Sequence, residues 1–416
     1  MFEWTTLFFS DTSSALHVGA YFALFLTSLF LVLYRHPLWT TRTARPRTLR
    51  LATLLGGLAI VAFTVTWTLI FQFFDTEAEL LRPLSREDWL KSPSTFVKAY
   101  EEVTTPTGYC WSSNLLMWVI PGCLFLQTEL KRRDLQPLTA LLYTATGFMG
   151  AISLSFPLFF GHLLLLDDDK KHKKHSGQLN SGKHTATHTH NRASYLQLVC
   201  ATAAAISVIV LPQTVHTHPV TYVQALMALH TVLAIPSMWD LMLLINPQQA
   251  TRATRATRAP RAPRVTPTHT SLLSTLSPLS LRNTYHVLAG ASFAVHVTQM
   301  VVGLKATNGN VLDLVWSGWQ NTCQSSISWD VVFTTLVCSV YVHARRGTAH
   351  SLAFVAFAPF LSIGAVWSLF LAKEEGGLGQ DNGSNATTNT ERTQKTQNQK
   401  KKTTPRSKSR TRTSSK

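Results

Sequence analysis

Cysteine is scarce in this chain, with five residues among 416 and no CxxC pair. Such a set gives neither a disulfide framework nor the spacing of a zinc or redox site. The segment before Ala15 contains Glu3 and Asp11 but no lysine or arginine, so it lacks the basic start of a signal or transit peptide. We therefore expect no cleaved leader.

Charge is also scarce, because only 14% of the residues are Asp, Glu, Lys or Arg. The apolar share of 45% is ordinary for a soluble chain, but here the apolar residues form long blocks and the charges fall between them. The blocks are too long and too unalternating for a barrel, and lipid leaves only helices as the other spanning structure. The sequence predicts an all-α, polytopic integral membrane bundle of about nine transmembrane helices.

The predicted organisation alternates spans with polar segments. In order, we expect a short acidic N terminus (1–14), two spans (15–74), an extramembrane cap (75–110), a hairpin of two spans (111–166), a His-rich insert (167–194), two spans (195–245), an Arg-rich insert (246–283), a seventh span (284–305), a second hairpin (328–372) and a basic tail (373–416). The inserts and tail have little to bury, which predicts disorder. In the cap, Phe96, Val97, Tyr100 and Val103 predict a short amphipathic helix.

The two hairpins share a layout. Each consists of two apolar runs joined by a turn with paired arginines, Arg132–Arg133 in the first and Arg345–Arg346 in the second. With nine full spans the hairpins are inverted copies, as in many secondary transporters. If one run is re-entrant, with the run containing Pro157 as the first candidate, the later loops change sides and the copies become parallel. A bond between Cys110 and Cys323 then becomes possible.

The net charge of +17 comes mainly from the loops and the tail. This placement predicts contact with anionic lipid headgroups of the bilayer and no binding of nucleic acid. Five arginines between residues 35 and 50 favour the cytoplasm for the loop after the first span. The sequence predicts neither a particular membrane nor an oligomeric state.

Polar residues inside the spans are the candidate site, because they are costly in lipid. His230 and His296 lie about halfway along their spans, Gln299 follows His296 by about one helical turn, and Asp240 lies near the end of the His230 span. We interpret them as the lining of a transport path or ligand site. Each histidine also has a plainer interpretation, as a core residue bonded to a backbone carbonyl. Asp330, near a span end, is explained by interfacial placement.

The His-rich insert offers a second candidate. His184, His188 and His190 have the HxxxHxH spacing that can bind zinc or copper weakly. The leading function requires no cofactor. In the alternative, His230 and His296 bind a haem.

The leading interpretation is a transporter or channel-like protein for a small solute, which is not an enzyme. One alternative is a membrane-embedded enzyme, either haem redox or lipid-modifying, although the sequence shows no nucleophile motif. Another is a membrane scaffold that binds anionic lipids through its basic segments.

Overall fold

The computed structural model describes residues 12–39, 44–81, 95–175, 194–217, 219–245 and 280–377. Within these ranges the chain is all helical. The helices are α2 (Thr12–Tyr34), α3 (Pro46–Leu81), α5 (Thr95–Glu102), α6 (Gly108–Arg132), α7 (Pro137–Met149), α8 (Ile152–His175), α9 (Tyr195–Thr217), α10 (Pro219–Ile245), α12 (Leu281–Ala306), α13 (Val311–Trp316), α14 (Thr322–Arg346), α15 (Thr348–Leu361) and a last described helix at 363–377, with 3-10 turns η1 (Pro37–Trp39) and η3 (Ser317–Trp319).

Five of these helices are long and apolar enough to cross a membrane, namely α3, α6, α10, α12 and α14. Shorter apolar stretches occupy Gly19–Tyr34, Tyr195–Leu211 and Thr348–Leu361. These helices are consistent with a membrane-embedded protein, and the predicted all-helical class is confirmed. The number of crossings stays a prediction. The inserts at 176–193 and 246–279 and the tail beyond 377 lie outside the described residues.

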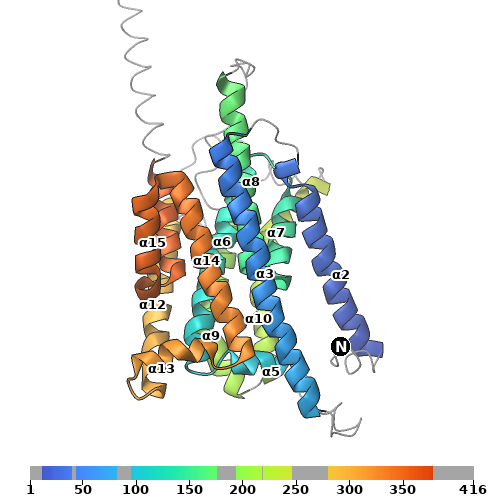
Figure 1. Cartoon of the computed structure of the whole chain (residues 1–416), viewed down its shortest axis with the longest axis vertical. Helices are drawn as coiled ribbons and strands as arrows, with labels where there is room; N and C mark the ends of the chain where they lie inside the picture. Colours follow the sequence, from blue (N-terminus) through green and yellow to red (C-terminus); the bar gives the residue numbers. More distant parts are fainter. Residues whose placement is uncertain are drawn as a thin grey trace, which may run out of the picture.

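The bundle has two ends, which we name by their contents. The arginine face, at the top of Figure 1, holds the C-terminal ends of α6 and α14, where Arg133 and Arg345 share Asp167. The far face holds α5 and α13 (Figure 1). Because Arg133 and Arg345 meet at one residue, α6 and α14 run in the same direction.

The second arm of the first hairpin was expected as one run, but it is two helices. α7 ends at Met149 and α8 begins at Ile152. The two run antiparallel, since the Tyr143 hydroxyl lies 3.0 Å from His162 Nδ1 and Ser155 Oγ donates to the Tyr143 carbonyl at 2.5 Å. We call α7 and α8 the first folded-back pair and residues 150–152 the first tip. Pro157 lies inside α8 and does not end it.

The second hairpin has the same break in its second arm. α15 ends at Leu361, Ser362 adopts a φ of 78°, and the last described helix follows. Lys373 Nζ lies 3.2 Å from His350 Nε2, so this helix returns to the arginine face. α15 and helix 363–377 form the second folded-back pair, and residues 361–363 are the second tip. The two hairpins therefore have the same orientation in this structure, and whether they are true repeats stays a prediction.

A residue pattern supports the duplication. Cys110, Ser112 and Ser113 form a Cys-x-Ser-Ser motif at the start of α6, and Cys323, Ser325 and Ser326 repeat it at the start of α14. Both motifs stand the same number of residues before their arginine pairs. Both cysteines are buried and free, so they form no disulfide.

Aromatic rings fill the space between the two copies. Trp118 of α6 meets Phe156 of α8 at 4.6 Å between ring centroids, and Phe160 stacks on Tyr341 of α14 at 4.4 Å. Trp367 of the second pair lies 5.4 Å from Phe160 and is fully buried. Ring pairs at these separations add to the stability gained from burial. The core therefore joins both folded-back pairs to the helices that precede them.

Candidate ligand-binding cavity

The first tip is held by a carboxylate from another helix. Asp330 of α14 accepts hydrogen bonds from the backbone N–H groups of Ser153, at 2.8 Å, and Ile152, at 3.3 Å. The first N–H groups of a helix have no partner within it, and an anion there is also favoured by the helix dipole. Asp330 is only 6% exposed, so it is a buried cap for α8.

The other side of the break is held by donors from peripheral helices. Trp67 Nε1 of α3 donates to the Gly150 carbonyl at 2.8 Å, and the Tyr21 hydroxyl of α2 donates to the Met149 carbonyl. The last carbonyls of α7 would otherwise lack partners. Backbone that leaves the helix at membrane depth is tolerated where protein buries it or where it borders a cavity. The first tip meets both conditions.

A cavity of about 260 Å³ lies beside the first tip. Its wall comes from α2, α3, α5, α6, α7, the start of α8, α10 and α14 and is largely apolar, with residues such as Phe22, Ile70, Leu116 and Leu226. Ala99 of α5 and Val103, which follows α5, line it near the far face, so α5 packs at one end of the cavity. An extramembrane cap at 75–110 stays a prediction. The residues of the lining that carry polar side-chain groups are Tyr21, Thr66, Trp67, Ser112, His230, Cys323, Ser326 and Asp330.

His230 contributes a defined tautomer to this cavity. Its Nδ1 lies 2.7 Å from the Leu226 carbonyl, which can only accept, so Nδ1 carries the proton. In the neutral ring Nε2 then holds a lone pair. The ring packs edge-on to Phe148 of α7 at 4.5 Å. His230 is therefore at once the carbonyl-bonded core histidine of the plainer interpretation and a member of the cavity wall.

The second tip is packed by small side chains. Ser362 Oγ lies 2.7 Å from Ser292 Oγ of α12 and accepts from the Ala365 N–H at 3.3 Å. His296 Nε2 lies 3.2 Å from the Pro359 carbonyl, and Asn114 Nδ2 lies 3.2 Å from His296 Nδ1. His296 is buried at this tip as a bridge between α6, α12 and α15.

The structure places the four predicted path residues in different surroundings. His230 lines the cavity, whereas His296 lies at the second tip. Asp240 forms an ion pair with Lys131 at 2.7 Å on the arginine face, and Gln299 is half-buried on α12. α10 packs on α9 and α7, whereas α12 packs on α6, so the two histidines do not meet in one site. The haem alternative, which needs both at one iron, stays a prediction.

The predicted metal ligands His184, His188 and His190 lie outside the described residues. Within the described ranges, no group of three or more His, Cys, Asp or Glu side chains could hold a metal ion. Zinc or copper binding by the insert therefore stays a prediction.

Sequence reasoning missed Asp330 as a site residue. Interfacial placement does not explain it, because the side chain is buried and bonded to backbone 177 and 178 residues away. The one sequence feature that could have indicated it is its position: Asp330 is a carboxylate at the start of an apolar run and not in a loop.

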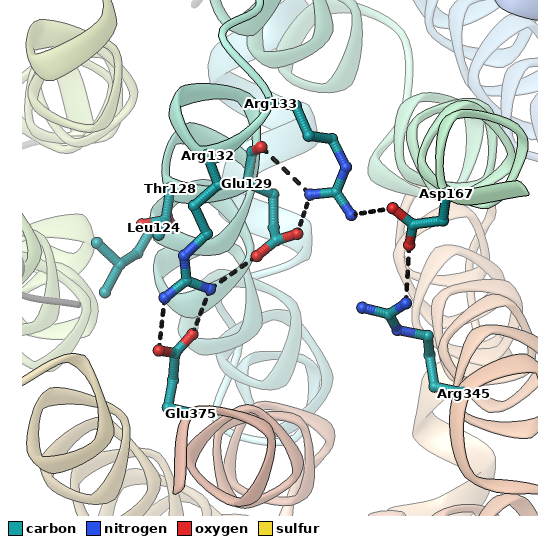
Figure 2. A network of polar contacts seen from close by, with 8 residues as sticks. All are labelled: Leu124, Thr128, Glu129, Arg132, Arg133, Asp167, Arg345 and Glu375. Carbon is teal, nitrogen blue, oxygen red and sulfur yellow. Dashed lines mark hydrogen bonds and ion pairs between the residues drawn. The ribbon is translucent and has the colours of Figure 1, made fainter. Parts of the chain in front are cut away.

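An ion-pair network closes the arginine face, as Figure 2 shows. Arg132 binds Glu375 through two parallel contacts of 2.7 and 2.6 Å and also contacts Glu129 at 2.9 Å. Paired contacts of this kind are the strongest form of an arginine–carboxylate bond. They join α6 to the second folded-back pair.

The network continues to the first folded-back pair. Arg133 contacts Glu129 and, at 2.9 Å, Asp167 of α8, and Asp167 contacts Arg345 of α14 at 2.8 Å. Burial disfavours the charged Arg133, but Glu129 and Asp167 outweigh it, so the pKa of Arg133 is raised. We call this alternating chain, from Glu375 to Arg345, the arginine clasp. It ties both copies together.

Comparison with known protein families, with curated proteins and with solved structures finds no match for this chain. The cavity and the broken helices are therefore the features of this chain that bear on its function.

Proposed function

We propose that this protein is a transporter or channel-like membrane protein and that its small solute binds in the cavity beside the first tip. The observation that carries the proposal is a helix broken inside an apolar bundle, with a cavity and a buried carboxylate at the break. Solute sites of secondary transporters are typically formed where helices are interrupted near the middle of the membrane. Apolar walls with a few placed polar groups are also typical of small-molecule sites.

The proposal includes a topology of seven crossings, by α2, α3, α6, α9, α10, α12 and α14, and two folded-back pairs that enter from the arginine face. Contacts at the helix ends support it. Gln197 near the start of α9 contacts Gln127 near the arginine face, and the Tyr109 hydroxyl at the far end of α6 donates to the Val208 carbonyl of α9. α9 therefore runs opposite to α6.

The arginine face is cytoplasmic in this proposal. Lys98 and Lys305 are the described cations at the far face, whereas many lie at the arginine face: Arg45, Lys131, Arg132, Arg133, Arg282, Arg345, Arg346 and Lys373. Basic residues near span ends favour the cytoplasm. Glycosylation reporters placed in 176–193, in 246–279 and after 377 should all stay unmodified, whereas a reporter at the N terminus should be modified. Modification at any of the first three positions would overturn the topology.

The two hairpins have the same orientation, so the proposal of transport receives no support from inverted repeats. Parallel repeats related by an axis along the membrane normal also occur in transporters, so the arrangement does not oppose the proposal. Its support is the cavity at the break.

The experiment is uptake by liposomes that contain the purified protein, with a mixture of small solutes outside and mass spectrometry of the contents. Leu116→Trp should fill the cavity and slow the uptake of whichever solute the wild type admits. Leu352→Trp is the matched control, because Leu352 is 65% exposed on α15 and the added ring would face lipid. If no solute enters faster than in protein-free liposomes, or if both variants behave alike, the proposed site is wrong.

A further inference from the structure

The hydrogen-bond donors around the cavity are already in use. Among the described lining residues, Trp67 Nε1 donates to Gly150, and the hydroxyls of Thr66, Ser112 and Ser326 donate to the backbone carbonyls of Ala62, Val103 and Thr66, respectively. The Tyr21 hydroxyl and His230 Nδ1 also donate to carbonyls. The thiol of Cys323, a weak donor, is the remaining side-chain donor of the lining.

The same residues leave acceptors available. A hydroxyl that donates to a carbonyl keeps oxygen lone pairs, and neutral His230 keeps the lone pair of Nε2. Asp330 uses both oxygens to accept from backbone N–H groups, and each oxygen can accept more than one hydrogen bond. A ligand in this cavity therefore meets acceptors in an otherwise apolar wall.

The charges around the cavity also favour a ligand that donates hydrogen bonds. Ile152 and Ser153 present N–H groups to the Asp330 carboxylate at the start of a 24-residue helix, and these hydrogen bonds offset part of the cost of burying a negative charge there. No Lys or Arg is found among the residues that line the cavity, all of which the structure describes. An anion would therefore face a carboxylate without a balancing cation, and burying such a pair is costly.

From this pattern we propose that the cavity selects small amines with an apolar body, whose ammonium group donates hydrogen bonds to Asp330, His230 Nε2 and the cavity hydroxyls. The inference deepens the proposed function and rests on it. The volume of about 260 Å³ is near the lower end for small-molecule pockets, which restricts the body to one ring or a short chain. The aromatic residues of the wall, Phe148 and Trp67 among them, suit such a body and also attract cations.

The test uses three probes with a common phenyl ring, namely 2-phenylethylamine, 3-phenylpropionate and propylbenzene. Binding to the full-length protein in nanodiscs is measured by calorimetry and by the shift of the thermal unfolding midpoint. The amine should bind about tenfold or more tightly than the carboxylate, which corresponds to one charge-assisted hydrogen bond. Propylbenzene should bind more weakly than the amine, because it fills the apolar volume but donates no hydrogen bond.

Two variants locate the preference. Asp330→Asn removes the charge and should reduce the amine preference to a few-fold. If its cap is too weak for folding, His230→Phe serves instead, because it keeps a ring against Phe148 and removes one acceptor. It should weaken the amine several-fold and leave propylbenzene unchanged. Phe293→Leu, on the exposed side of α12, is the control and should change neither.

The outcomes separate the two proposals. Equal or tighter binding of the carboxylate overturns the amine selectivity and leaves the cavity as a binding site. Failure of all three probes, with uptake of another solute still sensitive to Leu116→Trp, overturns the amine class alone. Failure of the probes together with absence of uptake overturns both proposals.

Discussion

The two tips are built on the same plan and filled differently. Both interrupt the second arm of a hairpin, after the turn with paired arginines, and both belong to pairs that return to the arginine face. At the first tip a charged residue holds the break and a cavity remains beside it. At the second tip hydroxyl contacts and a close backbone approach fill the space. The two tips thus share a layout, but among the described residues the cavity lies at the first and close packing at the second.

Close packing at the second tip is seen at Gly364. A Cβ on Gly364 would lie 2.5 Å from Ser292 Oγ and 3.1 Å from the Met117 carbonyl oxygen, so α6 and α12 approach the second tip directly. Bulky residues such as Phe148, Met149 and Ile152 surround the first tip and line the cavity. Large side chains that meet at their ends leave space between helices, whereas glycine and serine let backbones touch.

The largest effect is expected from a substitution in the arginine clasp, which contacts both folded-back pairs. Glu129→Ala takes the central carboxylate from the arginine clasp and leaves Arg132 and Arg133, whose side chains are 16% and 7% exposed, with fewer partners. Breaking a buried pair in this way costs about 3–5 kcal/mol of unfolding free energy. Denaturant unfolding in detergent micelles measures it, and both folded-back pairs should loosen together in hydrogen exchange.

The control for this prediction is Glu374→Ala. Glu374 pairs with Arg346, and the two side chains are 24% and 34% exposed, so the expected loss is below about 1 kcal/mol. Equal losses from the two variants would show that the clasp is not a buried network.

A smaller effect should be confined to the first tip. Asp330→Ala leaves the N–H groups of Ile152 and Ser153 without partners in a buried position, which costs about 2–3 kcal/mol. Hydrogen exchange should accelerate at these two amides and stay unchanged at the second tip. Ser292→Ala is the mirror experiment and should affect Ser362 and its neighbours alone. Exchange that rises at both tips after either change would contradict the separate roles of the tips.

The smallest expected effect is at the second tip. Gly364→Ala introduces a methyl group where Ser292 and Met117 leave no room, at a cost of about 1–3 kcal/mol. Gly290→Ala, on α12, has nothing within 4 Å of the new methyl and should be neutral or slightly stabilising, because alanine favours a helix. A neutral Gly364→Ala would mean that the second tip is not closely packed at this position.

The sequence predicted the class of fold because long apolar blocks in lipid permit only helices. It also indicated a short helix at Phe96, Val97 and Tyr100, where the structure has α5. It did not predict the breaks. Gly150 and Ser362 are unremarkable in sequence, and the helices end there because Asp330, Trp67 and Ser292 supply partners from other helices.

Only part of the candidate site could be predicted, because its other residues also depend on partners from other helices. His230 could be recognised from its depth in an apolar run, but whether a mid-span polar residue meets a cavity, a neighbouring carbonyl or an ion pair depends on helix neighbours. The same signal, a polar residue in an apolar run, marks three further residues that lie in different surroundings. His296 lies at the second tip, Asp240 is in an ion pair, and Gln299 is half-buried on α12. Asp330 could not be recognised, because its partners follow the first tip, far away along the chain.

The arginine clasp has a consequence for biosynthesis. Arg132 is made early, yet its paired contact with Glu375 joins residues 243 positions apart. During membrane insertion, Arg132 therefore has only Glu129 as a partner in the clasp. Its contact with Glu375 can form only after nearly the whole described chain has been synthesised. We expect chains truncated before Glu375 to lack this paired contact, so the clasp is complete only when nearly the whole described chain is in place.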